Sequence, residues 1–262
     1  MPSIRAFHVH AFSAEVHGGS PAGVCLLDGP LADEAIRAIA RDLGPSVSAF
    51  VWPEEGGKRA LRWFTRAGAE VQTYCGHATF AAAHIAFGEV GAAVEFETIS
   101  GPRRAKRNGE RITLEIPIWP VTKEPCPAAV AAAINQVPVA YYQGERDRLL
   151  VYAEPDEVRA LEPDFAKLNE LGDFGFICAA RSDDEIVFRF FCPGFDIGED
   201  EDPATGSAQS TLAPFWMDRL DLSRLTTRQA SGRGAVFQIE RDGDRLTVTA
   251  PCATFFEGVI HV

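Results

Sequence analysis

Two segments of the chain place a side chain that can carry a proton just before a glycine and a run of small apolar residues. In the first, Cys75 precedes Gly76 and His77; in the second, Asp202 precedes Gly206. If each run begins a helix, the helix N-terminus lowers the pKa of a nearby thiol, so Cys75 is a candidate base at neutral pH. Asp202 is the candidate for proton transfer on the opposite face of a substrate, and His77 for donating or shuttling a proton. The pattern favours proton transfer on a small molecule.

The same two helix starts predict that the molecule is an anion. A helix N-terminus presents free backbone N–H groups and about half a positive charge. Gly76 and Gly206 let a ligand approach the backbone closely, while Thr79 and Ser207 add hydroxyl donors. These donors also stabilise the charge of an enolate, so the carbon next to a bound carboxylate becomes more acidic. We therefore expect a small anionic substrate.

Each residue also has a purely structural interpretation, which the local sequence leaves open. A single cysteine at the end of a strand packs as a small hydrophobe. Asp202, which precedes Pro203, has the structural alternative of capping a helix and nothing more. The acidic run 199–202 can be a solvated loop. His84 lies within an alanine-rich segment and is expected to be a core histidine.

The composition restricts the class of partner and the compartment. The 25 Lys and Arg residues against 37 Asp and Glu give a net charge of −12, which disfavours nucleic acid and membrane surfaces. No apolar run approaches the roughly 20 residues that span a bilayer, and the N-terminus has no signal-peptide pattern. Six cysteines are scattered singly, without metal-ligand spacing. We expect a cytoplasmic protein with reduced thiols and no metal.

The order of predicted elements repeats along the chain. Strands precede a helix at about 31–43, and the almost wholly apolar segment 76–87 predicts a buried central helix. A second mainly apolar helix is predicted over 204–219. In both halves a strand that ends in an aromatic residue leads through a polar loop into this helix, which indicates a duplicated unit. A proline-rich stretch marks the boundary, so we expect halves at 1–118, joined by a last strand at about 250–262, and at 119–249.

Four segments resemble a known family. FTRAGAEVQTYCGHATFAAA (64–83) and FCPGFDIGEDEDPATGSA (191–208) are similar to the two signature blocks of the phenazine-biosynthesis PhzF-like isomerase family. GGSPAGV (18–24) and QASGRGAVFQIE (229–240) resemble its N-terminal and late blocks, and the likeness covers most of the chain in order. The resemblance implies an α+β, diaminopimelate-epimerase-like fold. Each of its two pseudo-symmetric halves is a curved mixed sheet around a central helix, with the active site in the cleft between them. It also implies a homodimer.

The function implied by the resemblance is cofactor-independent isomerisation of a small, often cyclic, amino or hydroxy acid. The family's substrate-contacting positions are present as Asp202, Gly76, His77, Gly206 and Ser207. Related proline racemases and diaminopimelate epimerases have a catalytic cysteine at the position of Cys75. Their second cysteine falls near Asp202.

One position departs from the family. The PhzF-like pattern SETxFV, whose Glu is the general acid/base, aligns with residues 46–51, and the Glu position is Val47. Three alternatives follow: two-base chemistry by Cys75 and Asp202, use of another carboxylate such as Glu70 or Glu199, or a lapsed enzyme that only binds a small carboxylate. Arg66 stands where the family has proline, as an anchor for a second carboxylate or an exposed arginine.

Overall fold

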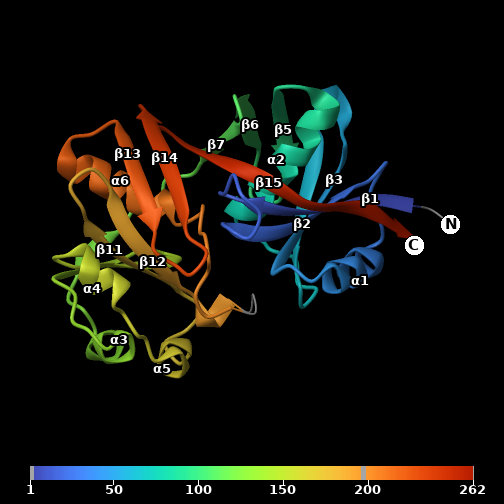
Figure 1. Ribbon diagram of the computed structural model, residues 1–262. Coiled ribbons are helices and arrows are strands. Elements are labelled where there is room, and N and C mark those ends of the chain that lie inside the picture. Colours follow the sequence, from blue (N-terminus) through green and yellow to red (C-terminus); the bar gives the residue numbers. More distant parts are fainter. Residues whose placement is uncertain (1–2, 196–198, 262) are drawn as a thin grey trace. The chain divides into compact units, whose positions relative to one another are not determined.

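The computed structural model describes residues 3–195 and 199–261, and the chain divides into two compact units. The first unit is Met1–Ile116 together with Thr247–Val262, and the second is Pro117–Leu246. The long C-terminal strand β15 (Arg245–His261) therefore begins in the second unit and continues in the first (Figure 1).

The sheet of the first unit closes on itself around one helix. Its strands lie in the order β1 to β7 followed by β15, and β15 also pairs with β1. Helix α2 (Gly76–Val90) packs against β1, β2, β3, β5, β6 and β7, while α1 (Asp33–Leu43) covers β3 and β4. The strands are β1 (Ser3–Ala11), β2 (Ser20–Leu26), β3 (Val47–Pro53), β4 (Arg59–Thr65), β5 (Ala93–Glu97), β6 (Arg103–Asn108) and β7 (Arg111–Ile116).

The second unit has a mixed sheet and one central helix of its own. The strand order runs from β14 to β8, and α6 (Gln209–Leu220) packs against β10 and β13. The strands are β8 (Thr122–Glu124), β9 (Ala140–Gln143), β10 (Asp147–Val151), β11 (Gly175–Arg181), β12 (Ile186–Phe191), β13 (Arg224–Gln229) and β14 (Ala235–Asp242). The shorter helices are α3 (Ala128–Ile134), α4 (Pro155–Arg159) and α5 (Phe165–Asn169).

The pairing pattern shows that the two units are copies of one plan. From β1 to β6 successive pairs are antiparallel, parallel, antiparallel, parallel and antiparallel. The strands from β9 to β14 repeat this alternation. The central helix follows the fourth strand of each series, α2 after β4 and α6 after β12. This is the duplication that the sequence predicted.

The central helices are buried for the reason that the sequence indicated. Residues 76–83 of α2 are all buried, as an apolar segment without a polar face must be. The second helix, predicted over 204–219, begins only at Gln209. Residues before it form tight turns, in which the N–H groups of Gln209 and Ser210 bond to the carbonyls of Gly206 and Ser207. The predicted start at Ala204 was wrong, because these turns bond to the carbonyl three residues back and not in the i−4 pattern of an α-helix.

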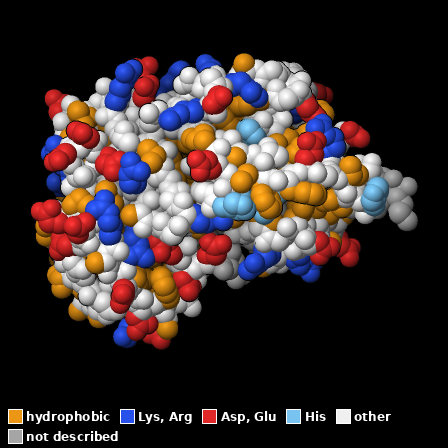
Figure 2. Space-filling model, viewed as in Figure 1, with side chains coloured by type: hydrophobic (Ala, Val, Ile, Leu, Met, Phe, Trp, Pro, Cys, Tyr) orange, Lys and Arg blue, Asp and Glu red, His pale blue; other side chains and the backbone are white. Residues whose placement is uncertain are grey.

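Charged side chains of both signs are interspersed on the face shown in Figure 2. Ion pairs between neighbouring strands include Arg104 on β6 with Glu95 on β5, and Arg224 on β13 with Glu240 on β14. Among the described residues, no helix has the length and apolar character required to cross a bilayer.

Gly19 gives a test of the turn between β1 and β2. Its φ is +60°, and a Cβ there would lie 2.0 Å from the carbonyl oxygen of Ala11. Gly56 has a similar φ of +71° but open space around it, so it isolates the conformational cost of about 1–2 kcal/mol. We expect Gly19→Ala to lower the free energy of unfolding clearly more than Gly56→Ala, as measured by urea denaturation. Equal effects would contradict a steric role for Gly19.

Candidate active site

Asp202 is a buried carboxyl group to which no cation among the described residues is bonded. Its side chain lies in the loop before α6 and is 7 % exposed. One oxygen, Oδ1, accepts a hydrogen bond from the N–H of Ala204 at 3.1 Å. Burial raises the pKa of Asp202 to about 7, while hydrogen bonds from Thr205 and Ala204 oppose the rise. At neutral pH such a carboxyl group can both give and take a proton.

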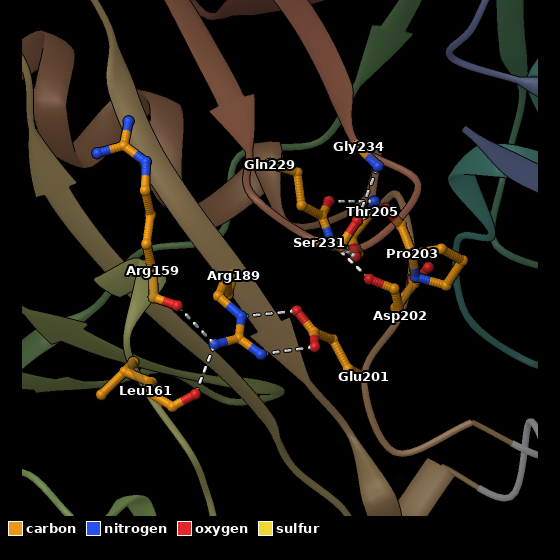
Figure 3. A network of polar contacts seen from close by, with 10 residues as sticks. All are labelled: Arg159, Leu161, Arg189, Glu201, Asp202, Pro203, Thr205, Gln229, Ser231 and Gly234. Carbon is orange, nitrogen blue, oxygen red and sulfur yellow. Dashed lines mark hydrogen bonds and ion pairs between the residues drawn. The ribbon is translucent and has the colours of Figure 1, made fainter. Parts of the chain in front are cut away.

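The loop that carries Asp202 is held by Gln229 at the end of β13 (Figure 3). The Nε2 amide of Gln229 donates to the Asp202 carbonyl at 2.6 Å and to Thr205 Oγ1 at 3.2 Å. Its Oε1 accepts from the Thr205 N–H at 2.6 Å. Ser231 donates to the carbonyl of Pro203 and accepts from the N–H of Gly234. The late signature segment 229–240 therefore fixes the backbone on both sides of Asp202.

An ion pair anchors the same loop from the other direction. Arg189 on β12 binds Glu201 through two hydrogen bonds of 2.8 and 2.7 Å, and Arg189 Nη1 also donates to the carbonyl of Leu161 (Figure 3). The N–H of Asp202 bonds to the carbonyl of Phe190 at 3.1 Å. These contacts fix the position of the Asp202 backbone, from which its side chain projects. Residues 196–198 of the second signature segment lie outside the described residues.

In the first unit, Cys75 and His77 lie together at the start of α2. Cys75 is the N-cap residue and is 8 % exposed; its Sγ lies 3.9 Å from His77 Nδ1. Burial lowers the pKa of His77 to about 4, so the imidazole is neutral at physiological pH. Its Nε2 atom is buried and has no hydrogen-bond partner within the described residues. A neutral imidazole in this state can donate or accept one hydrogen bond to a ligand.

Gly76 and Thr79 complete the first turn of α2. The first backbone N–H bonded along the turn is that of Thr79, to the carbonyl of Cys75, so the earlier amides have no acceptor within the helix. The Thr79 side chain is fully buried, and its hydroxyl donates to the Cys75 carbonyl at 2.6 Å. That contact uses the one hydroxyl proton that Thr79 has. The structure thus gives Thr79 a local role in holding Cys75.

The two units show which loop residues are equivalent. Phe64 bridges to Glu70, and Phe191 bridges to Glu201. Both glutamates bind an arginine of the preceding strand, Arg62 and Arg189 respectively. In both units the backbone N–H of the residue after this glutamate donates to the carbonyl of the residue before the phenylalanine. Val71 donates to the carbonyl of Trp63, and Asp202 donates to the carbonyl of Phe190.

The internal equivalent of Asp202 is therefore Val71 and not Cys75. Thr205, directly before Gly206, occupies the position that Cys75 has directly before Gly76. The two proton-carrying residues proposed from the sequence occupy different positions in their loops. Cys75 and Asp202 are therefore not equivalent residues of the duplicated unit.

The other sequence candidates have separate surroundings. Val47 is 3 % exposed at the start of β3, where an apolar side chain fits and a carboxylate would be desolvated. Glu70 is bound to Arg62 at 2.6 Å, which is an anchoring contact. Glu199 is exposed, and its charge contributes to raising the pKa of Asp202. Arg66 is also exposed. His84, expected to be a core histidine, is only half-buried and lies beside Thr254, with Nε2 3.0 Å from the hydroxyl oxygen.

Gly206 and Ser207 form the buried turn that leads into α6. Ser207 is 9 % exposed, and its Oγ accepts a hydrogen bond from Arg146 Nη1 at 2.9 Å. Sequence reasoning did not single out Arg146, because it lies 61 residues before Ser207 in an ordinary loop between β9 and β10. Gln229 was noted only as part of a family block. In 3–195 and 199–261, no three His, Cys, Asp or Glu side chains are grouped to hold a metal ion.

A family model described as phenazine biosynthesis-like protein (PhzC-PhzF) matches residues 9–258, which include both helix starts and the loop of Asp202. The chain belongs to this family. It is 40 % identical over 262 residues to an uncharacterized isomerase of Pseudomonas aeruginosa, with 98 % of each chain covered. A second uncharacterized isomerase of the same organism is 35 % identical over 265 residues, with 99 % of each chain covered.

Solved structures confirm the predicted fold class. A crystal structure of a PhzF-family protein from Enterococcus faecalis is similar with a TM-score of 0.92, 31 % identity and 100 % coverage of both chains. A probable proline racemase from Agrobacterium radiobacter has a TM-score of 0.61 at 14 % identity, over 99 % of this chain and 92 % of that one. The second likeness concerns the fold alone. The fold is therefore α+β and diaminopimelate-epimerase-like.

Asp202→Asn should change how stability depends on pH. In the unfolded chain Asp202 ionises near pH 3.9, whereas the folded pKa is about 7. The folded state thus binds this proton more tightly, and the contribution of Asp202 to stability decreases as pH rises from about 4 to 7. The difference between the unfolded and folded pKa of Asp202 corresponds to about 4 kcal/mol.

Asn keeps the acceptor for Ala204 but does not ionise. We expect the variant to match wild type near pH 4 and to be more stable at pH 8, by up to about 4 kcal/mol, in urea unfolding. Asp156→Asn makes the same chemical change in the same unit at a side chain that is 94 % exposed, and serves as the comparison. A stability difference between Asp202→Asn and wild type that does not change with pH would contradict the raised pKa.

Proposed function

We propose that the chain is a cofactor-independent isomerase or epimerase that moves a proton on a small carboxylate, a cyclic amino or hydroxy acid. The observation that carries this proposal is the buried carboxyl group of Asp202, whose pKa is raised to about 7. A group whose pKa lies near the operating pH is the most effective general acid or base at that pH. The relatives that are named isomerases support the reaction class.

In the proposed reaction, Asp202 in its ionised form removes a proton from the carbon next to the substrate carboxylate. The electron pair of that C–H bond moves into the carboxylate and forms an enediolate. The backbone N–H groups and hydroxyls at the two helix starts stabilise its negative charge. A proton then returns to carbon from the second proton carrier, and the first proton remains on Asp202 until the site is reset.

We assign the role of second proton carrier to Cys75, with His77 beside it. The 3.9 Å between Sγ and Nδ1 lets the imidazole orient or exchange the thiol proton. Because its pKa is about 4, His77 acts as a neutral donor rather than as an imidazolium. In this proposal both helix starts act on the same bound molecule. Gly76, Gly206 and Ser207 contact its anionic group, and Thr79 supports Cys75.

A second candidate function is binding of a small carboxylate without catalysis. It is favoured by one observation: the position of the family's acid/base Glu is the buried Val47. This alternative retains the anion-binding turns and predicts saturable ligand binding with no exchange of carbon-bound protons.

Deuterium uptake distinguishes the two functions. The protein is incubated in deuterated water with a panel of cyclic and acyclic amino and hydroxy acids, including dihydro-hydroxyanthranilate, and uptake is followed by mass spectrometry. We expect Asp202→Asn and Cys75→Ser each to lower the exchange rate at least about a hundredfold, the scale for losing an acid/base group. Exchange that is unaffected in both variants would rule out these residues as proton carriers. Ligand binding without uptake in wild type would favour the binding function.

Val47→Glu tests whether the site lacks only the family's carboxylate. A Glu at this buried position is desolvated, so its pKa rises towards neutrality and it becomes a suitable proton carrier. We expect the variant to gain exchange activity on dihydro-hydroxyanthranilate at a modest cost in stability. Val47→Gln has nearly the same shape without the titratable group, and must show no gain. Equal activity of the two variants would contradict the explanation.

A further inference from the structure

Arg146 connects a buried carboxylate to the hydroxyl of Ser207. Its Nε and Nη2 atoms donate to Asp147 Oδ1 and Oδ2 at 2.8 and 2.7 Å, and its Nη1 donates to Ser207 Oγ at 2.9 Å. The Asp147 side chain is fully buried, and that of Arg146 is 19 % exposed. A planar guanidinium held at both ends in this way has one orientation, which a lysine ammonium cannot reproduce.

The surroundings of Asp147 are shaped for this contact. Thr211 on α6 donates to Asp147 Oδ2 at 3.3 Å. Gly175 is the cross-strand partner of Asp147, and a Cβ there would lie 2.5 Å from Asp147 Oδ1. The glycine therefore leaves the space that the carboxylate occupies. The ring of Trp119 lies 4.4 Å from the Arg146 guanidinium carbon and restricts the side chain further.

This arrangement determines what the Ser207 hydroxyl can do. Its oxygen accepts a hydrogen bond from a cation, so one lone pair is occupied and the hydroxyl proton must point elsewhere. Hydrogen bonding to a charged donor also polarises the O–H bond and makes it a stronger donor. Ser207 follows Asp202 by five residues in the same buried loop.

We propose that Arg146 is a positioning residue, which fixes the Ser207 hydroxyl as a donor to the anionic oxygen of the bound carboxylate. The inference rests on the proposed function, since it assigns Ser207 to the same substrate. It adds a requirement that the substrate present an oxygen whose negative charge increases during the reaction, as the carboxylate of an amino or hydroxy acid does.

Arg146 also acts on Asp202 through its charge. The charged and titratable groups that face Asp202 are Glu199, Cys192 and Arg146. The negative charge of Glu199 raises the pKa of Asp202, and the positive charge of Arg146 lowers it. Removal of the Arg146 charge should therefore raise this pKa, whereas a lysine should preserve it in large part.

The experiment is a double-mutant cycle on Arg146 and Ser207 with two readouts. The variants are Arg146→Gln, Arg146→Lys, Ser207→Ala and Arg146→Gln/Ser207→Ala. Arg224→Gln is the matched control, because Arg224 lies in the same unit and its side chain is 80 % exposed. The first readout is the dissociation constant for pyrrole-2-carboxylate by calorimetry, together with kcat and KM for deuterium exchange. The probe is planar at the carbon next to its carboxylate, as an enediolate is.

We expect Arg146→Gln to weaken binding of pyrrole-2-carboxylate and to lower kcat about tenfold or more when Ser207 is present. In the Ser207→Ala background the further loss should be less than about threefold, because each substitution alone already removes the Arg146–Ser207 hydrogen bond. Arg146→Lys should resemble Arg146→Gln in this readout. Losses that are equal in the two backgrounds would overturn the positioning role.

The second readout is the pKa of Asp202 without ligand, from ¹³C NMR of labelled aspartate carboxyl groups assigned with Asp202→Asn. Arg146→Gln should raise it, Arg146→Lys and Arg224→Gln should leave it nearly unchanged, and an unchanged value in Arg146→Gln would contradict the placement of the charge. Coupling in the binding cycle without deuterium exchange in wild type would retain the positioning role and reject the isomerase. Absence of saturable carboxylate binding to wild type would reject both.

Discussion

The cost of removing a carboxyl group from water governs the chemistry of the second unit. Among its described residues two aspartates, Asp147 and Asp202, are buried, and their hydrogen-bond partners differ. Asp147 has a guanidinium on both oxygens and a threonine hydroxyl, so its charge is compensated where it lies. Asp202 accepts from a backbone amide and has no ion pair among the described contacts, so the neutral form is favoured until about pH 7. The same burial thus gives one structural carboxylate and one that can exchange a proton.

Keeping Asp202 in that state requires a rigid loop. A flexible loop would let the side chain reach water, and the pKa would return towards its ordinary value. Gln229 and Arg189 prevent this from opposite sides, one by binding backbone groups and the other through Glu201. The duplicated Arg62–Glu70 pair shows that anchoring by an ion pair belongs to the common plan of both units. The residue after the anchor has diverged, to Val71 in one unit and to Asp202 in the other.

The sequence predicted the family, the fold class and the central helix 76–87 because these depend on long apolar patterns and on contiguous motifs. The predicted start of the second helix at Ala204 is five residues too early, because the small uncharged residues 204–208 run without a break into the apolar helix. Thr, Gly and Ser in this segment have lower helix propensity than Ala and favour turns. The true start of the helix depends on Gln229 and Asp202, which take up the amides of Thr205 and Ala204. The contact of Arg146 with Ser207 joins residues that are 61 positions apart, so a local sequence pattern cannot predict it.

Strand β15 has a consequence for synthesis of the protein. Residues 252–261 pair with residues 3–11, so the first unit combines the beginning of the chain with its last strand. As the polypeptide leaves the ribosome, β1 emerges long before this partner strand, because the whole second unit lies between them in the sequence. The second unit, a continuous stretch from Pro117 to Leu246, is complete sooner. The usual order, in which an N-terminal part folds first, is reversed for the step that closes the sheet around α2. Until then one edge of β1 lacks its partner strand, and an unpaired strand edge can pair with another chain.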